Sequence, residues 1–348
     1  MPIRSLLRQL AFAAIAATAV IAFQNIPRAT AADPPATQPT GPQPIFVQGM
    51  HGAIFTACFN HDAKLLALGG ADGVFVIDAN GKILHDLGTQ HPVHSIAFSR
   101  DGTYLAAGVT DGAMLIIGVN DGVILRTIDC SNFTLDPAPA IAGFLPDNQS
   151  VVAGGTAVGV WSAADGQVQR RFQLPTPQNR LALSPDAKLL VTGWTAAGGL
   201  SLVDFASGRL THIQPQIKKE ELGGPPRNPR GADMVSFTAD GRHFYGGGLQ
   251  AGGLFFYNTS DGSQAGALTP DHFACGAISD DLRLLLWGTQ NLAPAGKPPA
   301  YDIVVTATTS KKELMRQPTD SPVAAVAISG NGRVMAAATL DGKVRLWR

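Results

Sequence analysis

The sequence predicts an all-β protein, a seven-bladed β-propeller of four-stranded antiparallel blades. Three observations predict this fold. A strand-and-turn pattern repeats seven times, tight-turn residue pairs recur in a fixed order within each repeat, and the stretches between them carry no helical periodicity. Four-stranded sheets arranged in a ring bury both faces against their neighbours, so a repeat of this kind forms a propeller.

Each repeat begins with an apolar strand that runs into a polar turn, as in ACFNHDAKLLALG and IAFSRDGTYLAAG. The residue before that turn marks each copy, and successive copies lie 39, 46, 39, 54, 41 and 50 residues apart. The seven marker residues are Phe59, Phe98, Phe144, Leu183, Phe237, Ile278 and Ile328. These spacings fit a unit of about 40 to 45 residues that carries insertions.

Three turns divide each repeat into four strands, which we denote a, b, c and d. Asp101-Gly102 is an example of the first turn, Asp72-Gly73 of the second and Asp121-Gly122 of the third. Such pairs supply the positive φ angles that tight hairpins require. The short β-branched stretches between them, such as GVFVID, are typical of strands.

These residues resemble the WD40 repeat family over nearly all of residues 45–348. The resemblance is carried by the x-F-S-x-D-G-x-x-L-A run, by the Asp-Gly pair before strand c, and by the end of that strand. The family's signature Trp stands only at Trp161 and Trp347, and its Gly-His opening is missing. The resemblance implies that Asp72, Asp111 and Asp341 belong to the family's His-Ser-Asp-Trp hydrogen-bond network.

The resemblance to the WD40 family also implies how the ring of blades closes. The seventh repeat stops at its third strand, VRLWR, while an unmatched strand, Ile45-Phe46-Val47, precedes the first repeat. As closure in the family implies, the N-terminal strand is predicted to complete the seventh blade.

Residues 1–31 are predicted to be a signal peptide that is cleaved after Ala31. Arg4 and Arg8 precede an apolar run from Leu10 to Phe23, and Ala29-Thr30-Ala31 fits the A-x-A cleavage pattern. The alternative is a retained membrane anchor, although the run is shorter than the roughly 20 residues that span a bilayer. A protein exported in this way is expected to be periplasmic or extracellular.

Residues 32–44 are predicted to form a Pro/Thr-rich linker, because DPPATQPTGPQP carries five prolines and no large apolar side chain. The propeller domain is therefore predicted to span residues 45–348.

Charge argues against a nucleic-acid partner. The chain has 26 basic and 26 acidic side chains, and signal cleavage would remove three arginines and no acid. Phosphate binding needs a concentrated basic surface. The three cysteines, Cys58, Cys130 and Cys275, form no C-x-x-C pair. Cys58 and Cys275 lie in apolar runs and are expected to be buried, inert thiols, although one disulfide is possible in an exported protein.

No sequence motif for a nucleophile elbow, zinc site, P-loop or EF-hand is found, so no catalytic residue, metal or cofactor is predicted. The sequence favours a non-catalytic scaffold that binds an unidentified protein or peptide, with no membrane insertion after cleavage. One alternative is a propeller enzyme, similar to lactonases or quinoproteins, that acts on a small molecule in the central channel. A second alternative is a glycan-binding module.

Three long connections indicate where a partner would bind. Residues 130–139, 214–230 and 291–300 are all d-to-a or b-to-c connections, which lie on one face of a propeller. Loops on a rigid scaffold carry function more often than core strands do. The candidate partner-binding residues are Phe133, Lys218, Lys219, Glu220, Arg227, Arg230, Phe273 and Tyr301.

Overall fold

A computed structural model describes residues 41–134, 138–174, 178–194, 200–213, 234–238, 240–248, 253–270, 272–290 and 299–348. The predicted signal peptide and most of the predicted linker lie outside these residues. The described residues belong to one compact unit, Gln38–Arg348. None of their helices is long and apolar enough to cross a membrane.

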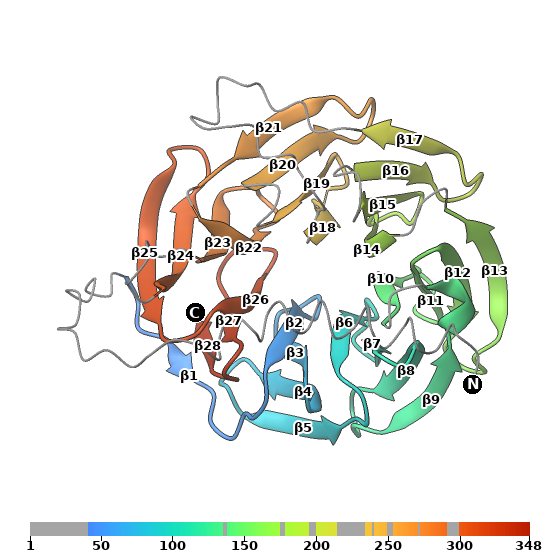
Figure 1. Cartoon of the computed structure of the whole chain (residues 1–348), viewed down its shortest axis with the longest axis horizontal. Coiled ribbons are helices and arrows are strands. Elements are labelled where there is room, and N and C mark those ends of the chain that lie inside the picture. Colours follow the sequence, from blue (N-terminus) through green and yellow to red (C-terminus); the bar gives the residue numbers. More distant parts are fainter. Residues whose placement is uncertain are drawn as a thin grey trace. The chain divides into compact units, whose positions relative to one another are not determined.

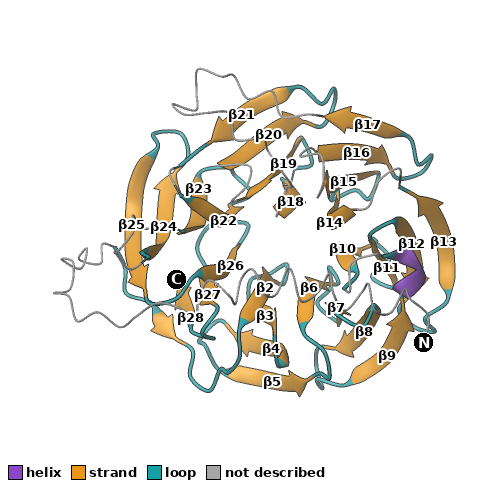
Figure 2. Ribbon diagram, viewed as in Figure 1, coloured by secondary structure: helices purple, strands orange, loops and turns teal. Residues whose placement is uncertain are grey.

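The described residues form seven four-stranded antiparallel sheets, which surround a common centre as the predicted propeller (Figure 1). Apart from one 3-10 turn, the regular structure is all strand (Figure 2). The elements are β1 (Ile45–Phe46), β2 (Ile54–Phe59), β3 (Leu65–Gly70), β4 (Gly73–Asp78), β5 (Ile83–Gly88), β6 (Val93–Phe98), β7 (Tyr104–Val109), β8 (Ala113–Gly118), β9 (Ile124–Asp129), η1 (Ser131–Phe133), β10 (Ala140–Phe144), β11 (Ser150–Gly154), β12 (Ala157–Ser162), β13 (Val168–Gln173), β14 (Gln178–Leu183), β15 (Leu189–Trp194), β16 (Leu200–Asp204), β17 (Leu210–Ile213), β18 (Met234–Phe237), β19 (His243–Gly248), β20 (Gly253–Asn258), β21 (Gln264–Leu268), β22 (Phe273–Ile278), β23 (Leu284–Thr289), β24 (Tyr301–Ala307), β25 (Lys312–Thr319), β26 (Val323–Ile328), β27 (Met335–Thr339) and β28 (Val344–Trp347). Blades one to six take four consecutive strands each from β2 to β25, and blade seven takes β26, β27, β28 and β1.

The predicted closure is confirmed, because β1 is the outermost strand of blade seven. Ile45 pairs with Leu346 and Phe46 with Arg345 in an antiparallel register, and the Val47 N–H donates to the carbonyl of Val344 at 3.0 Å. The first and last strands of the domain therefore share one sheet (Figure 1).

The core lies between neighbouring blades. Strands b and c are almost fully buried in the described part of each blade, whereas outer strands such as β5 alternate between half-buried and exposed residues. Seven hydrophobic clusters each join two adjacent blades; the cluster between blades seven and one, for example, packs Leu346 and Val344 against Leu68 and Phe75. Burial of apolar area on both faces of each sheet is what stabilises the ring.

The a-to-b turns are held by a repeated side-chain motif. The Ser99 hydroxyl donates to Asp101 at 2.7 Å and accepts from the main-chain N–H of Tyr104 at 2.9 Å. The same arrangement recurs at Ser184 with Asp186 and at Ser279 with Asp281. A short polar side chain that bonds the nearby backbone fixes the turn, and the sequence repeat is therefore a turn repeat as much as a strand repeat.

The three cysteines are free thiols, so none of them forms the disulfide that the sequence left possible. Burial raises the pKa of both Cys58 and Cys130 to about 12. A thiol with this pKa is a poor nucleophile at neutral pH, as expected for buried inert cysteines.

Candidate functional site

The d-to-a and b-to-c connections of a blade contact each other, so they lie on one face, which we call the connection face. In blade one the Ala71 N–H donates to the carbonyl of Ala53 at 2.8 Å. Thr110 donates in the same way to Pro92 in blade two. All three long connections named above belong to these two classes.

Histidine–aspartate pairs join the two kinds of connection in blades one and two. His51 Nδ1 lies 3.0 Å from Asp72 Oδ2, and its Nε2 lies 3.4 Å from Asp86 Oδ2. His91 Nε2 lies 3.7 Å from Asp111 Oδ2. Asp72 and Asp111 therefore lie against histidines of the preceding connection, in keeping with the hydrogen-bond network that the resemblance implied.

Blade seven uses a lysine in the corresponding place. Lys343 Nζ lies 3.0 Å from Asp341 and 3.1 Å from Asp320, which belongs to the preceding connection. Thr339 also donates its hydroxyl to Asp341. The Trp347 indole N–H is buried and has no hydrogen-bond partner among the residues that the structure describes, so the network that the resemblance implied does not extend to this Trp within them.

The His51 side chain is expected to make the stability of the propeller depend on pH. Its pKa is raised, first by the hydrogen bond to Asp72 and then by that to Asp86. A raised folded-state pKa adds stability that is fully present below the ordinary value near 6.5 and is lost as pH rises through the raised value. The melting temperature of the protein should therefore exceed that of His51→Gln by more at about pH 5.5 than at about pH 8.5. An equal difference at the two pH values would contradict this role.

The aromatic residues predicted to anchor a partner are buried instead. Phe133 packs edge-on against Trp161 at 4.7 Å, and Phe273 stacks on Trp287 at 6.0 Å. Phe133, Phe273 and Tyr301 are 6%, 1% and 7% exposed. The prediction needs correction here: Phe133 and Phe273 belong to the hydrophobic clusters between blades two and three and between blades five and six, and Tyr301 is buried as well.

The charged residues of the same prediction lie outside the described residues. They are Lys218, Lys219, Glu220, Arg227 and Arg230. Their role in binding stays a prediction.

In several blades one side chain forms a hydrogen bond to the next blade. We call such a side chain a latch. His85 Nε2 donates to the carbonyl of Val119 at 2.8 Å. Arg126 and Arg170 donate to the carbonyls of Ala164 and Ala206 at 3.0 and 2.7 Å. All three residues belong to strand d of one blade and bond the c-to-d turn of the next. Blade seven is joined to blade one by Arg348, whose Nε donates to the carbonyl of Ala79 at 2.7 Å.

Blade five has glycine where blades one to three have the latch. Arg126 lies opposite Ile116 and Arg170 opposite Val160, and Gly266 lies opposite Phe256 in the same way. A Cβ atom built on Gly266 would meet no atom within 4 Å. In the described part of the chain, no latch joins β21 to blade six.

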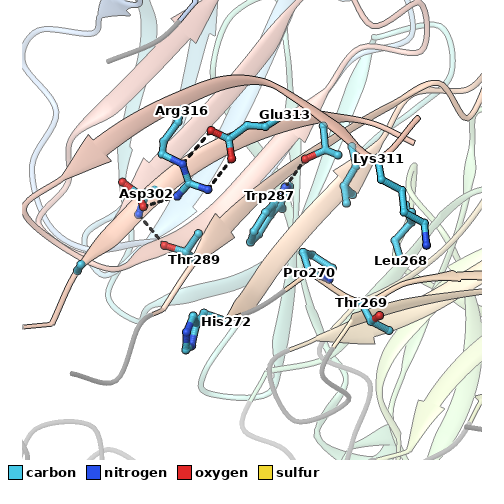
Figure 3. A pocket seen from close by; sticks show the side chains of 13 residues that line it. Leu268, Thr269, Pro270, His272, Trp287, Thr289, Asp302, Lys311, Glu313 and Arg316 are labelled. Atoms are coloured by element: carbon cyan, nitrogen blue, oxygen red, sulfur yellow. Dashed lines mark hydrogen bonds and ion pairs between the residues drawn. The ribbon is translucent and has the colours of Figure 1, made fainter. Parts of the chain in front are cut away.

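A cavity of about 410 Å³ lies between these two blades. Figure 3 shows the side chains that line it and labels ten of them. Blade five and the connection after it contribute Leu268, Thr269, Pro270 and His272; blade six contributes Leu285, Trp287, Thr289, Ala300, Asp302, Thr306, Lys311, Glu313 and Arg316. Because His272 and Ala300 belong to d-to-a and b-to-c connections, the cavity reaches the connection face.

An ion-pair cluster forms one wall of the cavity. Arg316 Nη1 lies 2.6 Å from Asp302 Oδ2, while Nε and Nη2 bond the two oxygens of Glu313 at 2.9 and 2.6 Å (Figure 3). The Arg316 and Asp302 side chains are only 27% and 15% exposed. The pKa of Arg316 is raised, first by the hydrogen bond to Glu313 and then by that to Asp302.

The other polar groups in the cavity wall are also fixed by hydrogen bonds. The main-chain N–H of Asp302 donates to the Thr289 hydroxyl at 2.8 Å, and the Trp287 indole N–H donates to Thr306 at 3.0 Å (Figure 3). Side chains fixed in this way keep their geometry before a ligand arrives, which lowers the entropic cost of binding.

Comparison with known families places two parts of the chain. Residues 57–136 match the sequence model of the anaphase-promoting complex subunit 4 WD40 domain. Residues 311–348 match the model of the WD domain, G-beta repeat. No curated protein matches the chain significantly. Among the described residues, no group of three or more His, Cys, Asp or Glu side chains is placed to hold a metal ion.

Proposed function

We propose that this chain, a WD40-like β-propeller, is a non-catalytic scaffold for a protein or peptide. In this proposal the partner binds the connection face, and the protein acts outside the cytoplasm. The observation that carries this proposal is the joint position of the long connections. They all belong to the two classes of connection that contact each other on one face of a closed ring. A rigid frame that presents variable loops on one side is suited to recognition.

The location rests on the first 31 residues. Two arginines, a short apolar run and an A-x-A site in this order are typical of a secretory signal peptide. A mature N-terminus at Ala32, read by mass spectrometry of the exported protein, would support the proposal. Retention of residues 1–31 would contradict cleavage and favour an anchor.

The partner is proposed to contact the connection that contains Lys218, Lys219, Glu220, Arg227 and Arg230. Four of these five side chains are basic and two are arginines, and Arg is enriched at the centres of protein interfaces. The same stretch of sequence contains prolines at 225, 226 and 229, and proline restricts the backbone, so less entropy is expected to be lost on binding.

Partner capture with matched variants tests the proposed face. Replacement of residues 218–230 by a short Gly-Ser turn should abolish recovery of a partner that the unaltered chain retains. The control carries Lys188→Ala and Arg242→Ala, which remove two exposed cations from the a-to-b turns of the opposite face. If the loop replacement folds and still recovers the same partner, the connection face is not the binding surface.

A further inference from the structure

The cavity between blades five and six is lined by Leu268, the last residue of β21, an outer strand that otherwise carries mostly small side chains. Its sequence is QAGAL, and Gly266 lies on the same side of the strand as Leu268, which lines the cavity. In blades two and three the corresponding position holds an arginine that bonds the next blade, whereas a Cβ on Gly266 would meet no atom within 4 Å. The cavity of about 410 Å³ lies in the range of small-molecule sites, about 300 to 1,000 Å³.

The charges around the cavity disfavour an ionic ligand. The Arg316 guanidinium is held by two carboxylates at 2.6 Å, so an anionic or cationic ligand would compete with ion pairs that are already formed. Lys311 is the remaining cation of the lining, and it is exposed to solvent. Asp302 and Glu313 balance Lys311 and Arg316, so the lining has no net charge when His272 is neutral.

The hydrogen-bonding groups suit hydroxyls. Each carboxylate oxygen of Asp302 and Glu313 can accept more than one hydrogen bond, and the hydroxyls of Thr269 and Thr289 can donate and accept. A ligand hydroxyl also does both, so it can bond such a wall without displacing the internal ion pairs.

The apolar part of the lining requires that the same ligand also has an apolar surface. Leu268, Pro270, Leu285 and Trp287 line the cavity together with the polar groups. A pyranose ring has hydroxyls around its edge and C–H groups on its faces, and it therefore matches a cavity in which polar and apolar side chains are combined.

From these features we infer that the cavity between blades five and six binds a neutral sugar, as a free saccharide or as one residue of a glycan. This activity goes beyond the protein-binding role proposed above. It uses side chains of blades five and six and does not require the connection at residues 214–230.

The test is saturation-transfer NMR with the full chain. The probes are the methyl glycosides of glucose, galactose, mannose and N-acetylglucosamine, with glucuronic acid and glucosamine as charged counterparts. Gly266→Leu should extend an apolar side chain into the open space beside Leu268, on the same face of β21, and weaken binding of a neutral glycoside at least about tenfold, which is about 1.4 kcal/mol. Gly88→Leu is the matched control, because Gly88 also lies on an outer strand and a Cβ there also meets no atom within 4 Å.

Three results would overturn the inference: no neutral glycoside binds at millimolar concentration, only the charged sugars bind, or Gly266→Leu binds as well as Gly88→Leu. If Gly266→Leu fails to fold, Gly266→Ala and Gly266→Val provide a graded series, in which affinity should fall as the side chain grows. An affinity that is unchanged along the folded members of this series would equally overturn the site.

Discussion

Removal of Ile45, Phe46 and Val47, with the linker kept, is expected to destabilise the propeller by about 3 kcal/mol. Each lost main-chain hydrogen bond to β28 contributes roughly 1 kcal/mol, and the rest comes from the Val47 side chain, which is 8% exposed and belongs to the core cluster between blades seven and one. Ile45 and Phe46 are 39% and 51% exposed. The loss arises because the deletion uncovers the edge of β28, whose Val344 and Leu346 are 1% and 0% exposed. Urea unfolding followed by circular dichroism measures the change.

The linker cannot replace the deleted strand. Pro42 and Pro44 would slide toward β28, and proline has no N–H to donate to a sheet. The matched control is Ile45→Ala with Phe46→Ala, which keeps the backbone and removes only exposed side chains; it should cost less than about 1 kcal/mol. If the deletion and the control have the same effect, main-chain closure does not stabilise the ring.

The sequence predicted the fold well because the turns are local. A Ser or Thr two residues before an Asp or Asn bonds the backbone within its own turn, so the pattern is visible in a short stretch of sequence. Five blades carry this turn, and the seven copies of the wider strand-and-turn repeat fix the number of blades. The unmatched strand at residues 45–47 then has one free edge to join. Strand order therefore followed from the repeat and the family resemblance.

The site was harder to predict because it depends on contacts between blades. Phe133 lies within a long connection, and nothing in the local sequence shows that it packs against Trp161 between blades two and three. Gly266 looks unremarkable within QAGAL until the register places it opposite Phe256 and beside blade six. The family's Gly-His pair is missing, because Met50 and Gln90 stand where its glycine would be. His51 and His91 nevertheless contact Asp72 and Asp111.

Trp161→Ala is expected to cost about 3 to 5 kcal/mol, as usual when a large buried aromatic residue is truncated. Trp161 is 0% exposed and packs with Met114 and Phe133 between blades two and three. Gly159, two residues earlier on the same strand, fits only because it lacks a side chain; a Cβ there would lie 2.3 Å from the Trp161 ring. The sequence GVW in β12 is therefore one packing unit, in which the glycine makes room for the indole.

A double-mutant cycle separates this explanation from a general loss of apolar area. Gly159→Ala should destabilise the unaltered chain, because its methyl group meets the ring, but should be neutral or stabilising in the Trp161→Ala background, where that space is empty. Trp161→Phe serves as the conservative control and should lose less stability than Trp161→Ala. If the effects of Gly159→Ala and Trp161→Ala simply add, the two residues are energetically independent and the indole of Trp161 is not what excludes a side chain at position 159.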